Sequence, residues 1–299
     1  MPSTTERNIS LTDVRQRLIE RIRSLESVAV AFSGGVDSAV VAKAAVEAVG
    51  ENAVAVTAVS PSLATAERNA AREEAVSIGI RHVEVHTTEF QRPEYQANAG
   101  NRCFFCKDTL YSLATSKLKE LGVACIINGA NVDDLGDHRP GMQAAADHAV
   151  VSPLIDVGID KATVRELARY WKLSVAEKPA SPCLASRIAY GVEVTEERVR
   201  RVELAEAFLK QITGLRELRV RHEADEVARI ELPLSDLAQL MDDRCREEVC
   251  SHFRSLGFRR ITLDLEGFRS GSLNEALPVV ALGVDAEITG GCNLSGASR

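Results

Sequence analysis

The sequence lacks any long apolar run and any excess of positive charge. No apolar stretch reaches the roughly 18 residues that cross a membrane, and the opening MPSTTERNIS lacks the apolar centre of a secretory signal. The formal net charge of −7 does not favour a general binder of polyanions such as nucleic acids. We therefore expect a cytoplasmic protein without a membrane or a stable nucleic-acid partner.

A disulfide framework and a histidine cluster are also missing. The chain has seven cysteines in 299 residues, an odd number that is typical of reduced thiols in a cytoplasm. The six histidines are scattered and form no ligand group in the sequence. With 45% hydrophobic and 26% charged residues, the composition is that of a globular protein with a substantial core.

Strand and helix patterns alternate through the first part of the chain. The predicted strands cover residues 28–32, 53–59, 82–88 and 124–129. The predicted helices cover residues 11–25, 38–50, 64–79, 107–122 and 161–173. The first two strands are apolar nearly throughout, as parallel strands covered on both faces are. This alternation predicts an α/β fold with a doubly wound parallel sheet.

A different pattern follows the turn-rich residues 174–191. The sequence predicts a helix, a hairpin, a second helix and a strand, at residues 195–214, 215–233, 234–257 and 259–267. We therefore divide the chain into a nucleotide-binding domain at 1–191, a smaller C-terminal α+β domain at 192–276 and a flexible tail at 277–299. The α+β domain would bind substrate or mediate oligomerisation, and we expect a homo-oligomer.

The sequence SGGVDS ends the first predicted strand and opens a helix. Ser33, Gly34 and Gly35 let main-chain amides approach an anion, because no Cβ stands in the way at the glycines. Ser33 and Ser38 add hydroxyl donors, and Asp37 could hold Mg²⁺ or orient the loop. The Walker ending Gly-Lys-Ser and the dinucleotide pattern GxGxxG are both absent. The alternative is a glycine-rich turn with a serine cap.

SGGVDS matches the PP-loop signature SGGxDS of the N-type ATP pyrophosphatases at every fixed position. This resemblance implies a domain that binds ATP and Mg²⁺, adenylates an oxygen of its substrate and releases pyrophosphate. It places the adenine against the second strand, at residues 56–60, which include Thr57. It also brings Gly129, in the loop NGANVDD, close to the nucleotide.

A second distinctive segment is EKPASPCLASRIAYG, residues 177–191, which contains Cys183. A thiolate at neutral pH needs a nearby cation, which Lys178 or Arg187 could supply, although a buried cysteine between domains is an alternative. The segment resembles KPAxxCLASRxxYG of the ATP-dependent sacrificial sulfur transferases, the LarE family. The resemblance continues through NRCFFCK, GANVDDLGDHRPG, LRVRHE and TLDLEGFRSGSLN and covers roughly residues 10–276.

The LarE resemblance implies adenylation of the carboxylates of a pyridinium dicarboxylic acid mononucleotide, during synthesis of the nickel-pincer nucleotide of lactate racemase. In the simplest version, Cys183 attacks the acyl adenylate and forms a thioester. Cleavage of its Cβ–S bond then leaves a thiocarboxylate and a dehydroalanine. The resemblance thus implies catalytic roles for Cys183, Asp37 and Arg187.

Cys103 and Cys106 form a CxxC pair that complicates this scheme. A zinc ribbon would need two more ligands, and no histidine lies nearby in the sequence. A disulfide or two structural thiols is one alternative. In a subset of the family, three cysteines hold a [4Fe–4S] cluster, which implies Cys103, Cys106 and Cys183 as ligands here. The fourth iron would be open to an extra sulfide, which would make sulfur delivery catalytic, and we adopt this interpretation.

Four further residues are candidates for substrate or metal contacts. Arg219 and Arg221 stand at i and i+2 on a predicted strand, so they share a face and could hold the substrate phosphate. An exposed charge pair on an edge strand is the alternative. Phe104 could stack on the substrate, although an aromatic residue there is more often part of the core. Glu231 is a possible metal ligand or proton-transfer group.

Three other functions remain open at this point. A tRNA thiolase would share the PP-loop and the three cysteines but would be expected to carry a basic face or an added RNA-binding module. An ammonia-dependent synthetase of the NAD or GMP type has the same loop but needs no cysteine. A non-catalytic module would bind ATP without releasing pyrophosphate.

Overall fold

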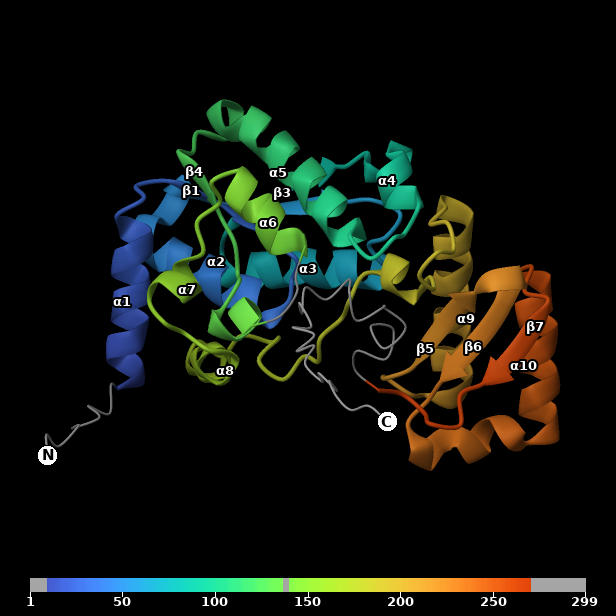
Figure 1. Cartoon of the computed structure of the whole chain (residues 1–299). Helices are drawn as coiled ribbons and strands as arrows, with labels where there is room; N and C mark the ends of the chain where they lie inside the picture. The colour runs from blue at the N-terminus through green and yellow to red at the C-terminus, as the bar shows by residue number, and fades with distance from the viewer. Residues whose placement is uncertain (1–9, 137–139, 270–299) are drawn as a thin grey trace, which may run out of the picture.

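Figure 1 shows the computed structural model, which describes residues 10–136 and 140–269. The predicted tail at 277–299 lies outside the described residues. The N-terminal helices are α1 (Leu11–Arg23), α2 (Val36–Val49), α3 (Thr65–Ile78), α4 (Pro93–Gln96), α5 (Arg102–Leu121), α6 (Pro140–Asp147), α7 (Pro153–Asp156) and α8 (Lys161–Tyr170). The strands are β1 (Val28–Ala31), β2 (Ala53–Val59), β3 (Arg81–His86) and β4 (Cys125–Ile127). Short 3-10 helices are η1 (Gly50–Asn52), η2 (Glu89–Gln91), η3 (Val132–Gly136) and η4 (Leu184–Arg187).

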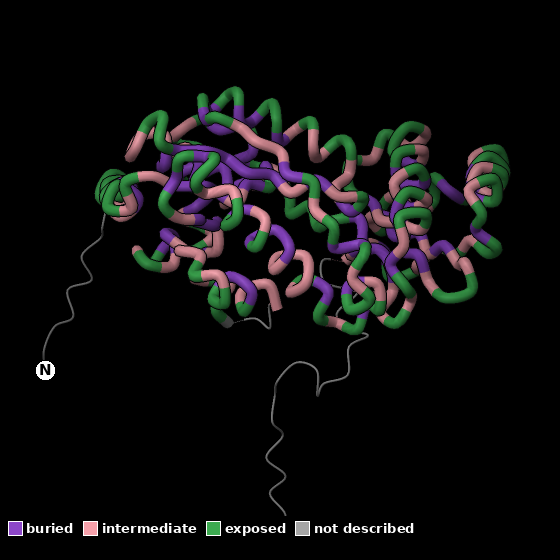
Figure 2. The backbone as a smooth tube through the Cα atoms, turned by 90° about the horizontal axis from the view of Figure 1, so that it is seen from above, coloured by how far each residue is buried: buried purple, intermediate pink, exposed green. Residues whose placement is uncertain are grey.

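The four strands form one parallel sheet in the order β3-β2-β1-β4. Side chains alternate across it: Val28 and Val30 of β1 pack with α1, α2, α3 and α8, whereas Ala29 faces α5 and α6. Helices therefore cover both faces, as Figure 1 shows, and Figure 2 shows buried residues concentrated along the sheet. The predicted doubly wound α/β fold is confirmed. Its switch point lies between β1 and β4, and ligands of such sheets bind at the carboxyl ends of the strands.

The C-terminal part contains a second sheet with its own apolar core. Its elements are α9 (Glu196–Thr213), β5 (Arg219–Glu223), η5 (Ala224–Glu226), β6 (Val227–Glu231), η6 (Leu234–Met241), α10 (Asp243–Ser255) and β7 (Arg260–Leu263). β5 and β6 form the predicted antiparallel hairpin, and β7 pairs with β6 in parallel. The core lies between this sheet and α9 and α10.

Two predicted helices differ from those observed. The single helix predicted at 234–257 is wrong: η6 ends before Asp242, whose extended backbone and side chain cap α10 by accepting from the Cys245 N–H at 3.1 Å. Helix α5 begins at Arg102, five residues before the predicted start at residue 107, so Cys103 and Cys106 lie in its first turns. The helix therefore fixes the positions of the two cysteines relative to each other.

Residues 184–202 pack between the two sheets. Leu184, Ile188 and Val199 belong to one buried cluster with Phe90 and Tyr95 of the N-terminal part. Backbone contacts add to this packing, because the Ala189 N–H donates to the carbonyl of His222 in β5 at 3.0 Å. The division of the chain between residues 191 and 192 stays a prediction, as does the homo-oligomer.

No helix within 10–136 or 140–269 has the length and apolar character needed to span a bilayer.

Candidate active site

The loop between β1 and α2 is built for close backbone approach. Gly34 has a φ of +69°, and a Cβ there would stand 2.8 Å from Cα and Cβ of Ala71 in α3. The Ser38 hydroxyl donates to the Gly35 carbonyl at 3.0 Å, and the Gly35 N–H donates to the Ser33 hydroxyl at 3.3 Å. Glycine is required at position 34 both by the left-handed backbone and by the contact with α3. The loop therefore lies at the carboxyl end of β1, and its contact with α3 helps to fix its shape.

Asp37 receives two partners from distant parts of the chain. Its carboxylate accepts from the Asn131 amide at 3.1 Å and pairs with the Lys161 ammonium at 2.5 Å. Lys161 is the first residue of α8, whose N-terminus is capped by the Asp160 carboxylate at 2.8 Å from the Thr163 nitrogen. The sequence prediction missed Asn131 and Lys161, although the capping aspartate marks where α8 starts.

Gly129 lies against the start of α2. A Cβ at this position would stand 2.8 Å from the backbone nitrogen of Ser38 and 2.9 Å from the carbonyl carbon of Asp37. The predicted neighbours of the nucleotide, Gly129 and the SGGVDS loop, are therefore in contact with one another.

Thr57 lies in the interior of β2 rather than at its end. The side chain is buried, and its hydroxyl donates to the Phe32 carbonyl at 2.8 Å and lies 2.8 Å from Nε2 of His82. These bonds join β2 to the residue that follows β1 and to β3. A cavity of about 490 Å³ is lined by Val59 and Ser60, farther along the same strand. The adenine contact of Thr57 stays a prediction.

The three predicted cluster ligands converge although they come from two segments. Cys103 and Cys106 lie in the first turns of α5, and Cys183 precedes η4. Burial raises the pKa of the Cys106 thiol to about 12, with Glu89 and Cys183 adding to the rise and Lys107 opposing it. The pKa of Lys107 is raised in turn, first by Tyr111 and then by all three cysteines.

The arrangement of these thiols is not that of a site for a single ion. Among the residues that the structure describes, no group of three or more histidine, cysteine, aspartate or glutamate side chains is placed to hold one metal ion. Ligands of a [4Fe–4S] cluster bind different irons, so their sulfur atoms lie farther apart than those around one ion. Thiolates are the ligand type of such clusters, and the binding of a cluster by Cys103, Cys106 and Cys183 stays a prediction.

Arg187 contacts the backbone of the cysteine segment. Its side chain is 4% exposed; Nε donates to Glu206 of α9 at 3.0 Å, and Nη1 donates to the carbonyl of Cys183 at 3.0 Å and to that of Pro182. Lys178, the other predicted cation for a thiolate, pairs with Glu67 at 2.7 Å. Both cations thus have carboxylate partners, whereas Lys107 lies close enough to all three cysteines for them to raise its pKa.

Arg221 and Glu231 form a buried ion pair in the C-terminal sheet. The guanidinium donates to both carboxylate oxygens, at 3.0 and 2.9 Å, and to the Ser186 carbonyl at 3.0 Å. Arg229 adds a bond to Glu231 at 2.8 Å and one to Asp264 at 2.5 Å. Glu231 is therefore a counter-ion of these arginines in this structure, and its metal or proton-transfer role stays a prediction.

Arg219 differs from Arg221 in its contacts. It forms no salt bridge with a carboxylate of the described residues, donates to the Leu218 carbonyl at 2.7 Å and lies 4.9 Å from the ring centre of Phe268. Burial lowers its pKa, and the nearby Arg187 and Arg221 lower it further. Glu206 and Glu217 act on the pKa in the opposite direction, but neither forms a salt bridge with Arg219, so its guanidinium lacks the direct carboxylate partner that Arg221 has. Phe104 packs edge-to-face on Phe105 and on the core beside α5, so its substrate contact stays a prediction.

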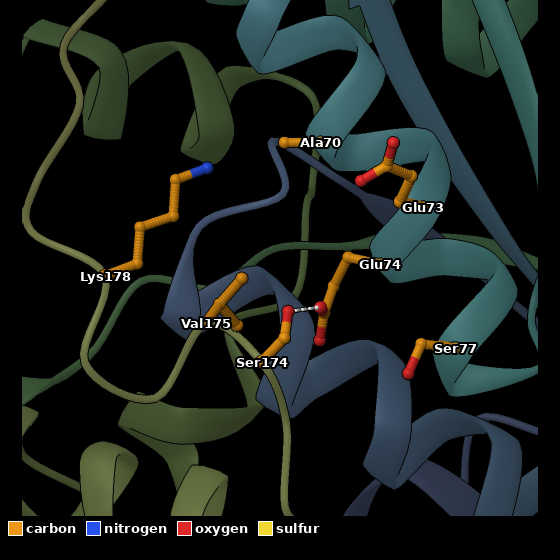
Figure 3. Close-up of a pocket in the computed structure, with 7 residues that line it drawn as sticks. All are labelled: Ala70, Glu73, Glu74, Ser77, Ser174, Val175 and Lys178. Atoms are coloured by element: carbon orange, nitrogen blue, oxygen red, sulfur yellow. Dashed lines mark hydrogen bonds between the residues drawn. The ribbon is translucent and has the colours of Figure 1, made fainter.

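A cavity of about 400 Å³ lies beside α3. Figure 3 shows that its polar side chains diverge: Ser174 points to Glu74, whereas Glu73 and Lys178 point elsewhere. Its lining includes Lys178, whose ammonium donates to the Gly34 carbonyl, but not Asp37, Lys161 or any of the three cysteines. We therefore do not place the active site in it.

Comparisons with known proteins identify the family. A family model described as asparagine synthase matches residues 13–95. An uncharacterized protein of Synechocystis sp. is 45% identical over 267 residues, which are 89% of this chain and 97% of that protein. The pyridinium-3,5-bisthiocarboxylic acid mononucleotide synthase of Lactiplantibacillus plantarum is 33% identical over 272 residues, 90% of this chain and 96% of the relative. The chain belongs to the LarE family.

Membership of the LarE family confirms the resemblance carried by SGGVDS and by the segment around Cys183. The match to the asparagine synthase model includes the whole SGGVDS loop and supports the use of ATP. The roles of individual LarE residues in this chain stay predictions.

The geometry of Gly34 predicts a selective loss of ATP binding. In Gly34→Ala the new Cβ would meet Ala71, so the loop must shift and lose amide contacts to the phosphates. We expect ATP affinity, measured by calorimetry with Mg²⁺, to fall about tenfold or more. Gly122→Ala is the matched control, because its φ of +72° carries the same backbone strain and no atom lies within 4 Å of the new Cβ. Equal affinity in both variants would mean that the loop does not hold the phosphates.

Proposed function

We propose that this LarE-family protein is an ATP-dependent sulfur transferase. It adenylates the carboxylates of a pyridinium dicarboxylic acid mononucleotide and converts them to thiocarboxylates for nickel-pincer nucleotide synthesis. The observation that carries the proposal is the convergence of Cys103, Cys106 and Cys183 in a chain aligned with 96% of a pyridinium-3,5-bisthiocarboxylic acid mononucleotide synthase. Thiols at this position favour sulfur transfer over the ammonia-dependent amide synthesis of other PP-loop proteins.

Adenylation is the first step. An oxygen of the substrate carboxylate attacks the α-phosphorus of ATP, the bond to the bridging oxygen breaks, and pyrophosphate leaves. The amides of the SGGVDS loop and the ammonium of Lys161 would stabilise the charge on the departing group. Asp37 would hold Mg²⁺, because this ion is usually bound by one or two carboxylates together with substrate phosphates. AMP is then a much better leaving group than a carboxylate oxygen.

Sulfur transfer is the second step. Cys103, Cys106 and Cys183 would hold a [4Fe–4S] cluster, which when bound supplies an iron with an open position for an extra sulfide. Lys107 would balance the negative charge of the thiolates. Phe105 and the buried Tyr95 pack next to Cys106 and would limit the access of water.

The substrate phosphate would bind at Arg219. Arg221 is held by Glu231, so its main effect would be to keep the strand and Arg219 in position. This modifies the sequence prediction, in which both arginines bind the phosphate directly. The partner is thus a small nucleotide rather than a nucleic acid.

The proposed adenylation predicts AMP and pyrophosphate as products. We expect both to form from ATP when Mg²⁺ and a pyridinium dicarboxylic acid mononucleotide are present, as measured by chromatography of the nucleotides and a pyrophosphate assay. Asp37→Ala should abolish both products, because it removes the group that binds Mg²⁺. Asp147→Ala, an exposed aspartate in α6, should leave them unchanged. Formation of ADP and phosphate would rule out the proposed reaction.

The proposed cluster predicts that iron and sulfur transfer are lost together. Cys103→Ala and Cys106→Ala should lower both the iron content of anaerobically purified protein and thiocarboxylate formation, because each removes a ligand. Cys245→Ala, which replaces a cysteine on the distant α10, should change neither. Sulfide added to the wild type should support repeated turnovers. Colourless protein after reconstitution, with H₂S lost from residue 183, would instead identify Cys183 as a sacrificial donor.

The charge on Arg219 predicts a specific loss of substrate affinity. Arg219→Ala removes a charge-assisted contact, so the dissociation constant of the pyridinium substrate should rise about tenfold or more. ATP affinity should stay the same, and Arg259→Ala at an exposed site should affect neither ligand. Equal weakening of ATP binding would place Arg219 in the nucleotide pocket instead.

A further inference from the structure

One face of α3 contacts both the PP-loop and the segment that leads to Cys183. Glu67, Ala71 and Glu74 share this face, because residues four and seven positions apart in a helix are aligned. Ala71 packs under Gly34, as described above. Glu74 accepts a hydrogen bond from the Ser174 hydroxyl, which Figure 3 shows, and thereby fixes the beginning of the segment.

Glu67 holds this segment nearer to the cysteine. One carboxylate oxygen accepts from the Lys178 ammonium at 2.7 Å, and the other accepts from the Ser181 hydroxyl at 3.0 Å. The Lys178 ammonium also donates to the Gly34 carbonyl at 3.3 Å, so it touches the PP-loop and Glu67 together. The Lys178 and Glu67 side chains are only 21% and 28% exposed, which limits the screening of their interaction by water.

Other side chains contact residues 178–183 at their two ends: Arg165 donates to the Lys178 carbonyl at 3.3 Å, and Arg187 donates to the carbonyls of Pro182 and Cys183. Residues 178–183 form no helix or strand, and Pro179 and Pro182 have no backbone N–H to donate. The next anchor is Leu184, whose N–H donates to the Ser62 carbonyl at 2.8 Å, three residues beyond the end of β2. The position of Cys183 over the carboxyl edge of the sheet thus depends on Glu67 on one side and on Ser62 and Arg187 on the other.

We infer that Glu67 is a positioning residue that aligns the cysteine segment with the PP-loop, so that the sulfur site meets the acyl adenylate. The inference rests on the proposed function. Glu67 contacts neither Asp37 nor Lys161, and its link to the PP-loop runs through Lys178 to the Gly34 carbonyl, which is not one of the amide donors proposed to hold the phosphates. Sulfur transfer requires the reacting atoms to approach within about 3–3.5 Å, and a displacement of about 1 Å can slow such a step 100-fold. Loss of Glu67 therefore uncouples the two steps.

The test is the yield of thiocarboxylate for each pyrophosphate released, measured in the same reaction. In Glu67→Ala this ratio should fall about tenfold or more, while pyrophosphate release stays within about twofold of the wild type. Glu67→Gln keeps an oxygen that can accept from Ser181 and should restore much of the ratio. The matched control is Glu177→Ala, because Glu177 precedes Lys178 directly and forms an exposed ion pair with Arg169.

Hydrogen exchange measures the position of the segment without any catalytic assay. The Leu184 amide should exchange about tenfold faster in Glu67→Ala than in the wild type and at an unchanged rate in Glu177→Ala. An unchanged ratio of products, or an unchanged exchange rate, would overturn the inference. A wild type that releases no pyrophosphate would instead contradict the proposed function, and the exchange experiment would still decide the role of Glu67.

Discussion

The buried ion pair between Arg187 and Glu206 is the interaction on which the arrangement of the site depends. The two side chains are 4% and 5% exposed, and the guanidinium also binds the carbonyls of Pro182 and Cys183. Two charges withdrawn from water are tolerated only while both partners are present, because a lone buried charge is strongly destabilising. The pair therefore joins α9 to the cysteine segment at one fixed point, and the hydrogen bonds of Ala189 to His222 and of Arg221 to Ser186 join the same part of the chain to β5.

At the carboxyl edge of the parallel sheet, strands and helices support the loops that carry the proposed reactive groups. Strands and helices supply the support: β1 leads into the SGGVDS loop, α3 lies beneath Gly34, and α8 presents Lys161. The groups proposed for chemistry stand on loops or first helical turns, where backbone amides are free to meet a ligand. Main-chain donors that are already in place need no reorganisation when charge develops on the leaving group.

In the C-terminal sheet, Arg219 and Arg221 lie on the same strand but have different contacts. The strand register places Arg219 opposite Glu231 and Arg221 opposite Arg229. The Glu231 carboxylate nevertheless binds Arg221, its diagonal neighbour, and also Arg229. Arg229 also pairs with Glu223 and Asp264, whereas Arg219 has no carboxylate partner of this kind among the described residues. The ion pairing of these arginines is thus decided by which carboxylates reach them and not by their place in the strand alternation.

The sequence by itself determined the order of strands and helices in the N-terminal part, the position of the SGGVDS loop and the shared strand of Arg219 and Arg221. These features are local, because apolar periodicity, glycine and helix caps act within a few residues. Tertiary structure alone decided which side chains meet. Lys161 reaches Asp37 across 124 positions and Lys178 reaches Glu67 across 111, and no periodicity encodes such pairs. Asp242 shows the same limit at short range. The apolar helical pattern continues through this residue, but its extended backbone ends η6 and its carboxylate caps α10.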